Sequence, residues 1–449
     1  SPIIFGPSRR FQRHWPRDWA AVVPRVMRRN AARFNKQYLL PLAGFGGGVG
    51  AGFLSMPLGL TLTQRHEEGM QVEQPDKKQA AVGYNHQALV GDGTRVDPYA
   101  KAIERVAAGR RALDVGTGPV CLLARLCLRG GATSTDAVEF CEASVQNAVE
   151  SFKAECSQGG AASDGSKLVP SAASLVVEEV REEDGSSGGR RATVRVGSGG
   201  SQQPRQELQL FEGLSTDPSL ALRGGYNLLV HELLGDLAGS EGAAAVIADI
   251  RSRGLVTQDC IFVPRSSSTM IAPTTQLRRT FMEEMVHRFG HGGTARLEPG
   301  QRYQAIRFNR DALLADPQAL EILSFQGDIE LQQHRVLEFR TEYDGDFDGV
   351  HLHLHVDLDG DEFIDVHDLH STPTGDTLCS WNTTYIRLLE EPIPLPAGSR
   401  IVLRCHADLR QVVLGETQES KALARYVVEV EVGEVGAEKH VAAITWRGG

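Results

Sequence analysis

The sequence predicts an α/β domain with a parallel sheet, followed by a domain of mostly antiparallel β structure. Two observations lead to this prediction. Between residues 100 and 263, short apolar strands alternate with helical segments, which is typical of parallel strands connected by helices. After Pro264 the pattern becomes alternating and rich in β-branched residues. With 449 residues, the chain is long enough for two cored domains and further length without a core.

The elements of the first domain are expected in a regular order. Each strand is a short apolar run, and each helix has apolar residues on one face. The expected strands are residues 111–115, 135–139, 208–211, 226–232 and 260–263, and the expected helices are residues 100–106, 122–128, 143–152 and 243–252.

Residues 157–206 interrupt this alternation with clusters of glycine and serine. Loops tolerate added length at a small cost in closure entropy, so we interpret this stretch as a low-complexity surface insertion. Within it, residues 174–180 and 192–196 are expected to pair as a hairpin.

The second domain is predicted to be β-rich, with helical patterning restricted to residues 278–288 and 311–323. Its clearest strand patterns are residues 351–356, 384–389, 400–405 and 426–432. The resulting domain boundaries are 1–75 for an N-terminal extension, 76–263 for the first domain and 264–449 for the second.

Composition excludes some classes of function. The formal net charge of −10 argues against wholesale coating of nucleic acid and favours a basic or neutral partner. The seven cysteines are scattered and include no C-x-x-C pair, which fits a reducing compartment such as the cytoplasm or nucleus.

The N-terminal extension differs from the rest of the chain. Residues 1–36 contain eight arginines and one lysine against a single acid, Asp18, which is a composition of organelle-targeting segments or basic tails. Residues 37–64 carry no charge, but their glycine-rich centre and the flanking Pro41 and Pro57 favour a flexible linker over a membrane span.

A glycine loop follows the first predicted strand. The run Asp114-Val-Gly116-Thr-Gly118 lies between a strand and a helix, where glycines let the backbone approach a ligand and the helix N-terminus favours polar groups. Glu139, at the end of the next strand, is a candidate acceptor for both hydroxyls of a ribose, or alternatively a helix cap. Together they indicate a nucleoside cofactor. A second glycine run at residues 46–51 has no strand before it and no helix after it, so it is a weak candidate.

Four further segments resemble the protein arginine methyltransferases. They are residues 86–99 with His86, Asp92, Arg95 and Tyr99; residues 231–241 with two glutamates nine positions apart; residues 262–273; and residues 371–398 with the pair Ser380-Trp381. The segments occur in the family's chain order and cover residues 84–449 apart from the insertion. The sequence Glu-Leu-Leu-Gly and the Ser-Trp pair resemble the corresponding motifs in the branch of the family that makes symmetric dimethylarginine.

The resemblance implies a Rossmann-like S-adenosylmethionine methyltransferase domain followed by an antiparallel β-barrel domain. It implies S-adenosyl-L-methionine as cofactor and a protein substrate with Arg/Gly-rich segments. It also implies a homodimer, formed through a helical arm for which residues 278–304 are the candidate. Neither direct nucleic-acid binding nor membrane insertion is implied.

Individual roles follow from the matched positions. Glu232 and Glu241 would be the catalytic clamp for the substrate guanidinium. The cofactor-binding residues would be Arg95, Asp114, Gly116, Gly118, Glu139, Thr216 and Asp217, with Arg95 on the cofactor carboxylate and Thr216 and Asp217 on its adenine. The substrate side would be lined by Leu89, Ser380 and Trp381.

The residue types alone also support a guanidinium-binding role for Glu232 and Glu241. Two carboxylates can bind a guanidinium bidentately and fix one nitrogen toward an electrophile. Arginine is almost never deprotonated in water, so positioning and electrostatics must provide most of the catalysis. An alternative role for one of the two glutamates is to cap the helix that begins near Ser240.

The sequence departs from the family at several positions. Val120 replaces a third glycine of the loop, Ser380 replaces a histidine, Leu89 replaces a methionine or phenylalanine, and residues 76–83 lack an expected aromatic pair. Two alternatives therefore stand beside arginine methylation: a weak or inactive relative that binds a protein partner, and a methyltransferase with a different substrate.

No metal site is predicted. The acidic run at residues 357–368 has its glycine in the fourth rather than the sixth place of a calcium loop, so we interpret it as an acidic hairpin turn. His351, His353 and His355 share one face of a strand, but no other group of ligands converges on them in the sequence.

Overall fold

The computed structural model describes residues 91–157, 176–184, 190–197, 206–275, 299–300, 302–305, 310–371, 379–410, 424–433 and 439–447. All of them belong to one compact unit, Gly59–Gly449. The predictions for the N-terminal extension, for residues 37–64 and for Leu89 lie outside the described residues.

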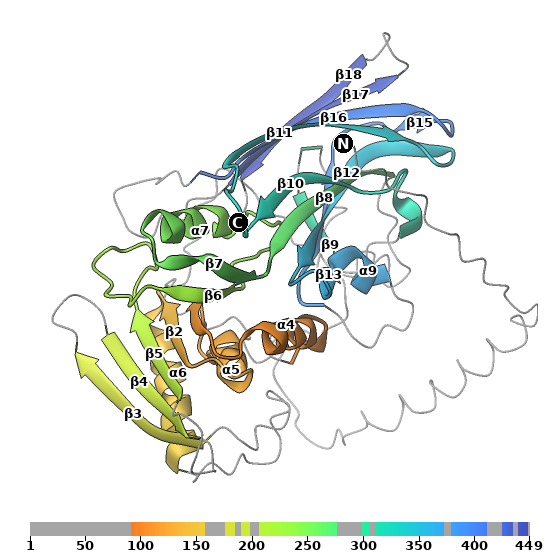
Figure 1. Ribbon diagram of the computed structural model, residues 1–449. Coiled ribbons are helices and arrows are strands. Elements are labelled where there is room, and N and C mark those ends of the chain that lie inside the picture. Colours follow the sequence, from red (N-terminus) through yellow and green to blue (C-terminus); the bar gives the residue numbers. More distant parts are fainter. Residues whose placement is uncertain are drawn as a thin grey trace, which may run out of the picture. The chain divides into compact units, whose positions relative to one another are not determined.

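The first half forms the expected α/β domain (Figure 1). Its sheet has the strand order β3-β4-β5-β2-β1-β6-β7, and the five strands from β5 to β7 pair in parallel. These strands are β1 (Arg111–Val115), β2 (Ser134–Glu139), β5 (Gln206–Glu212), β6 (Tyr226–His231) and β7 (Val256–Val263). The helices are α4 (Gly93–Val106), α5 (Leu122–Arg129), α6 (Glu142–Ser157) and α7 (Ala243–Ser252). Every strand and helix predicted for this domain is confirmed.

The strand order determines where a ligand can bind. The chain runs from β1 through β2 to β5 on one side of the sheet, and then returns to β6 and β7 on the other side of β1. In open sheets of this kind, ligands bind beyond the carboxyl ends of the strands where the order reverses. The loops that follow β1 and β6 therefore meet at the expected binding edge.

The insertion contributes to the sheet. Its predicted hairpin is confirmed as β3 (Val176–Asp184) and β4 (Arg190–Gly197), and β4 pairs antiparallel with β5. The alternating sequence of β4 buries Ala192 and Val194 completely, in one apolar cluster with Phe152 of α6. Part of the segment that was interpreted as a surface insertion is thus core structure at the edge of the sheet.

The second half consists of two antiparallel sheets (Figure 1). The larger contains β8 (Ser266–Thr275), β9 (Arg302–Ala305), β10 (Gln318–Ser324), β12 (Gly345–Asp357), β13 (Phe363–Asp365), β14 (Thr383–Arg387) and β15 (Ile393–Leu395). The smaller contains β11 (Gln332–Arg340), β16 (Arg400–Asp408), β17 (Arg425–Gly433) and β18 (Lys439–Arg447). The short helix α9 (Val366–Ser371) follows β13.

One helix prediction in this half is wrong, and the helical pattern at residues 278–288 lies outside the described residues. Residues 311–323 form only the 3-10 turn η2 (Arg310–Ala312) and then strand β10, because Pro317 biases the residue before it away from helical geometry. The last residues of the candidate arm at 278–304 belong to strand β9, which pairs with β14, and the arm itself stays a prediction. Residues 276–298 lie outside the described residues.

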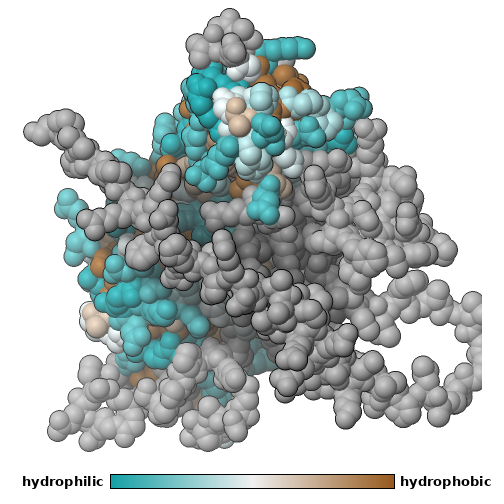
Figure 2. Space-filling model, turned by 90° about the vertical axis from the view of Figure 1, so that its right-hand side faces the viewer, coloured by the Kyte–Doolittle hydropathy of each residue, from teal (hydrophilic) through white to brown (hydrophobic). Residues whose placement is uncertain are grey.

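One apolar cluster continues from the first half into the second. It includes Leu113 and Leu229 of the parallel sheet together with Leu354 and Val430 of the antiparallel sheets. On the face shown in Figure 2, the coloured surface is mainly hydrophilic with small hydrophobic areas. Within the part of the chain that the structure describes, no helix is long and apolar enough to cross a membrane.

Candidate functional site

The glycine loop after β1 has the geometry that only glycine adopts easily. Gly116 and Gly118 have φ values of 76° and 66°. A Cβ on Gly116 would lie 2.8 Å from Cδ2 of Leu233, in the loop that follows β6, whereas a Cβ on Gly118 would meet no atom within 4 Å. Gly116 therefore permits close packing of two loops, and Gly118 leaves open space at the binding edge.

Glu139 closes the glycine loop from the neighbouring strand. Its Oε2 accepts the amide of Gly118 at 2.9 Å, and its Oε1 accepts the amide of Cys141 at 2.9 Å. These contacts orient a carboxylate at the end of β2, where a ribose acceptor is expected.

Two residues near Glu139 carry exposed apolar side chains that the sequence analysis did not assign. Phe140 is 63% exposed and Leu214 is 48% exposed. They follow β2 and β5, and the amide of Gly213 donates to the carbonyl of Glu139 at 2.9 Å. Their position directly after two strand ends is the sequence signal that could have identified them. Exposed apolar side chains beside an oriented carboxylate suit a flat ring linked to a sugar.

Asp114 is fully buried within the loop. Its Oδ2 accepts the amide of Ala124 at 2.9 Å and the hydroxyl of Thr117. Burial raises the pKa of this carboxyl to about 7. Asp114 thus ties the glycine loop to the first turn of α5, and its predicted contact with a cofactor stays a prediction.

The turn after β5 contains Thr216 and Asp217. Asp217 is exposed, and its Oδ1 accepts the amide of Ser219 at 2.8 Å. Hydrogen bonds from Ser219 lower the pKa of Asp217. Thr216 is partly buried in the same turn. Their roles toward adenine stay predictions.

The structure brings together Arg95, Glu232, Ser380 and Trp381. Nη2 and Nε of Arg95 lie 2.7 and 3.1 Å from Oε1 of Glu232. Nη1 donates to Oγ of Ser380 at 2.6 Å, and the guanidinium carbon lies 3.9 Å from the centre of the Trp381 ring. A guanidinium is thereby held by a carboxylate and stacked on an aromatic ring at the carboxyl end of β6.

Charge around Arg95 favours its ionised form. Burial disfavours the cation, but Coulombic attraction and hydrogen bonding to Glu232 oppose this effect, and the pKa of Arg95 is raised. The pair is poorly accessible, since the side chains of Arg95 and Glu232 are 7% and 27% exposed.

Asp92 connects the start of α4 to the Ser380 segment. One oxygen accepts the amide of Thr94 at 3.0 Å, and the other accepts the amide and hydroxyl of Ser380 at 2.7 and 2.8 Å. Asp92 belonged to a recognised motif but received no role in the sequence analysis. Its function as a helix cap is visible in the sequence, whereas its contact 288 positions away is not.

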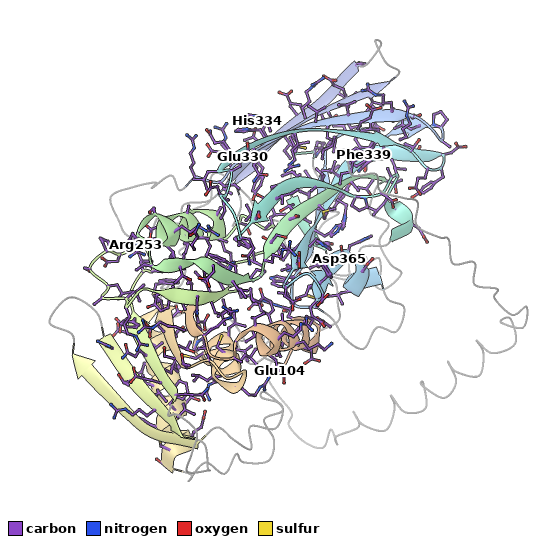
Figure 3. All side chains as sticks on the ribbon, in the orientation of Figure 1. Glu104, Arg253, Glu330, His334, Phe339 and Asp365 are labelled. Atoms are coloured by element: carbon purple, nitrogen blue, oxygen red, sulfur yellow. The ribbon has the colours of Figure 1, made fainter. Side chains whose placement is uncertain are left out.

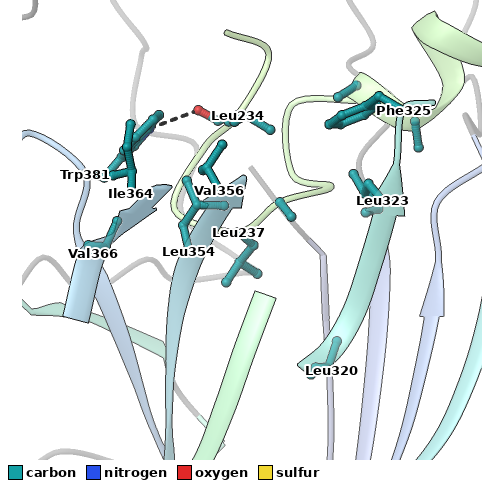
Figure 4. Packing of buried hydrophobic residues seen from close by; sticks show 14 of the residues in the cluster. Leu234, Leu237, Leu320, Leu323, Phe325, Leu354, Val356, Ile364, Val366 and Trp381 are labelled. Atoms are coloured by element: carbon teal, nitrogen blue, oxygen red, sulfur yellow. Dashed lines mark hydrogen bonds between the residues drawn. The ribbon is translucent and has the colours of Figure 1, made fainter. Parts of the chain in front are cut away.

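Residues 232–241, here called the clamp loop, are fixed by the second domain. Nε1 of Trp381 donates to the carbonyl of Leu234 at 3.1 Å (Figure 4), and the amide of Asn382 donates to Asp236 at 3.1 Å. Figure 4 also shows Ile364 close to Trp381. These contacts hold the first half of the clamp loop.

Glu241 lies at the other end of the clamp loop. Its side chain is exposed, and its Oε1 would be 3.5 Å from a Cβ on Gly235, so it lies against the loop. That Glu232 and Glu241 converge on one ligand stays a prediction.

The histidines of β12 share one face of the strand, as their spacing predicted. The rings of His351 and His353 pack with His367 of α9, with centroids 5.0 to 5.3 Å apart. His353 and His355 both face Asp365, at 3.6 and 3.1 Å, and Asp365 is labelled in Figure 3. No group of three or more His, Cys, Asp or Glu side chains among the described residues could hold a metal ion.

The acidic run at 357–368 contains the predicted hairpin turn between β12 and β13. Asp357 accepts the amide of Gly360 at 2.7 Å, and Asp359 accepts the amide of Glu362 at 2.9 Å. Asp359 also pairs with Arg105 of α4 at 2.7 Å. These carboxylates therefore stabilise the turn.

Comparisons with known proteins bear on the fold. No family model and no curated protein matches the chain. One similar solved structure is the Trypanosoma brucei PRMT1 enzyme–prozyme heterotetrameric complex with AdoHcy, at 14% identity and a TM-score of 0.52, covering 82% of this chain and 99% of that chain. Another is an open conformation of Arabidopsis thaliana protein arginine methyltransferase 10, at 14% identity and a TM-score of 0.54, with the same coverage. The predicted fold class, a Rossmann-like domain followed by an antiparallel β-barrel domain, is confirmed.

Proposed function

We propose that this chain is an S-adenosylmethionine-dependent methyltransferase that modifies arginine guanidinium nitrogens of protein substrates. The observation that carries the proposal is the contact between Glu232 and Arg95. A carboxylate at the carboxyl end of β6 binds a guanidinium through two donors, while Trp381 covers the face of the cation. The two solved structures reported above, which share this fold, are by name arginine methyltransferases.

The residues around the glycine loop fit the cofactor. Glu139 offers an oriented carboxylate for the ribose, and Phe140 and Leu214 offer apolar surface for the base. The open space at Gly118 accommodates the adjoining part of the molecule. The solved Trypanosoma complex holds AdoHcy, the demethylated product of this cofactor. When bound, S-adenosylmethionine would supply a methyl group on a positively charged sulfur.

Glu232 and Glu241 would hold the substrate. Both guanidinium contacts from Arg95 reach Oε1 of Glu232. The other oxygen, Oε2, makes no hydrogen bond to a described residue and would accept the second guanidinium. The transfer would form a nitrogen–carbon bond and break the sulfur–carbon bond, with AdoHcy as the leaving group, and one guanidinium proton would pass to solvent water. The clamp carboxylates would lower the barrier by orienting the nitrogen and by concentrating positive charge on the rest of the guanidinium.

The first test is incubation of the full chain with labelled cofactor and an Arg/Gly-rich peptide. We expect label on arginine, and we expect Glu232→Gln to abolish turnover while cofactor affinity stays within about 1 kcal/mol. Glu338→Gln is the matched control, because that carboxylate is exposed, lies on β11 and pairs with Arg400. Cofactor binding without any methyl transfer would refute the catalytic proposal.

Two finer proposals concern the product and the assembly. Ser380 beside Trp381 supports symmetric dimethylarginine, which mass spectrometry of the product would distinguish from the asymmetric form. A homodimer is proposed from the family resemblance, and the Trypanosoma structure is a heterotetramer. Light scattering of the purified chain measures this, and a monomeric mass would contradict it.

The second candidate function is a catalytically silent relative that binds a protein partner. Arg95 favours it, because an internal guanidinium already occupies Glu232. Lack of S-adenosylmethionine binding in calorimetry would favour this second candidate.

A further inference from the structure

A buried carboxylate of the second domain lies under the clamp loop. Glu321, on β10, is fully buried, and its Oε1 accepts the amide of Gly239 at 3.1 Å. The same oxygen accepts the hydroxyl of Tyr426, on β17, at 3.0 Å and the hydroxyl of Thr269, on β8, at 2.5 Å. Oγ of Thr269 in turn accepts the amide of Ala238 at 2.9 Å. Two consecutive amides of the clamp loop are thus bound, directly or through one hydroxyl, to a single carboxylate oxygen.

Burying a carboxylate is costly, which makes this arrangement informative. A carboxylate without compensating hydrogen bonds costs several kcal/mol to bury, so buried acids are retained where their bonds have a use. Burial raises the pKa of Glu321, while its hydrogen bonds to Thr269, Gly239 and Tyr426 oppose the shift. An apolar residue would fill the same volume at lower cost, but it would leave three donors without an acceptor.

The steric environment of Gly239 supports the same conclusion. A Cβ at this position would lie 2.7 Å from Cδ2 of Leu409, 2.9 Å from Oε2 of Glu321 and 3.0 Å from the hydroxyl of Tyr426. The backbone of the clamp loop is therefore in direct contact with the second domain at Gly239. This contact restricts the backbone conformation between Glu232 and Glu241.

We propose that Glu321 is a positioning residue that sets the path of the clamp loop, and through it the placement of Glu232 and Glu241. Trp381 and Asn382 hold the first half of the loop, and Glu321 holds the second half. Its effect on methyl transfer rests on the proposed function. Its effect on the loop does not.

The experiment compares Glu321→Met with Glu321→Gln in the full chain. Methionine removes the acceptor at similar volume, whereas glutamine keeps one oxygen that can accept the same three donors. Hydrogen exchange of peptides that cover residues 232–241 is the first readout. We expect at least tenfold faster exchange in Glu321→Met and at most threefold in Glu321→Gln. Unchanged exchange in a folded Glu321→Met variant would overturn the proposal.

Gly239→Ala perturbs the same contact without changing Glu321. It should also accelerate exchange of the clamp loop, because its Cβ displaces the buried groups. Gly327→Ala is the matched control, since its Cβ would meet only Oγ of Ser324, at 4.0 Å. Glu338→Met is the control for the removal of a carboxylate, because Glu338 is an exposed residue of β11 that pairs with Arg400. Equal exchange in Gly239→Ala and Gly327→Ala would contradict the proposed contact.

The kinetic readout separates the two proposals. We expect kcat/KM for the peptide to fall at least tenfold in Glu321→Met, mainly through KM, while the Kd for S-adenosylmethionine changes less than twofold. A loosened loop with unchanged kinetics would refute the role of Glu321 in catalysis. If the unmodified chain transfers no methyl group, the proposed function fails, and hydrogen exchange alone decides whether Glu321 positions the loop.

Discussion

The contact between Arg95 and Glu232 predicts a measurable coupling energy. Arg95→Met removes two donors to Oε1 of Glu232, at 2.7 and 3.1 Å, one donor to Ser380, and the stacking on Trp381. Hydrogen bonds to charged groups contribute about 1.5–3 kcal/mol each, and stacking of a cation on an aromatic ring about 0.5–2 kcal/mol. Because these contributions are not additive, we expect Arg95→Met to lower the free energy of unfolding by about 3 kcal/mol.

The part of this loss that belongs to the ion pair can be isolated. Glu232 is 27% exposed, so solvent screens its side of the pair and reduces the net interaction. We therefore expect a coupling energy of about 1–2 kcal/mol between Arg95→Met and Glu232→Gln in a double-mutant cycle.

Urea unfolding followed by tryptophan fluorescence measures both values, with Trp381 adjacent to the perturbation. Arg105→Met with Asp359→Asn is the control pair, because Arg105 is exposed and its coupling should be near zero. A coupling energy between Arg95 and Glu232 no larger than that of the control would refute the role assigned to this contact.

Three further predictions follow from the glycine loop, the buried acid beside it and the exposed ring next to Glu139. Gly116→Ala should lower the free energy of unfolding by about 2–3 kcal/mol, because a positive φ and the close approach of Leu233 act together. The control Gly109→Ala has a similar φ but open space around it, and should lower the same quantity by about 1 kcal/mol. Equal shifts of the melting temperature in the two variants would contradict this prediction. The pKa of Asp114 is raised from 3.8 to about 7, so its contribution to stability is fully present below pH 4 and is lost as the pH rises to about 7, and Asp114→Asn should flatten the melting temperature over that interval. Phe140→Ser should change the free energy of unfolding by no more than about 0.5 kcal/mol, because the ring is 63% exposed. It should nevertheless weaken S-adenosylmethionine binding severalfold in calorimetry, whereas the control Val336→Ser, at a residue that is 64% exposed, should not. An unchanged Kd would count against a base beside Phe140.

The α/β half could be predicted because its signals are local. Each strand is a short apolar run, and residues 243–252 are a helix in both the prediction and the structure. Gly116 and Gly118 were recognisable because a strand, a glycine turn and a helix follow one another in the sequence. Local patterns of this kind identified the elements themselves, even though β1 pairs with the distant strand β6, as in the pair Ala112 and Leu228.

The antiparallel half was harder to predict. Residues 318–324 form strand β10, and burial alternates along its last four residues. The spacing of apolar residues between 311 and 323 nevertheless led to the prediction of a helix. Strand β9 is only four residues long, and its pairing with β14 joins positions about 80 apart, so tertiary contacts rather than local propensity decide its conformation.

The candidate site could also be predicted only in part from the sequence. Glu139 and Glu232 could be proposed from their places at strand ends. The contact of Asp92 with Ser380, and the binding of Arg95 to Glu232, join residues 288 and 137 positions apart. No periodic pattern encodes such pairs. Glu321 was likewise invisible, because a glutamate in a strand normally indicates a solvent-facing position.

The long-range contacts of α4 have a consequence for synthesis. The helix is synthesised well before its partner, because Ser380 lies 288 residues after Asp92. In chains that end before residue 380, Arg95 lacks the hydroxyl of Ser380 and the indole of Trp381 that hold it in the full chain. The contacts around Arg95 therefore depend on the segment at residues 380 and 381, so a chain terminated before that segment lacks them.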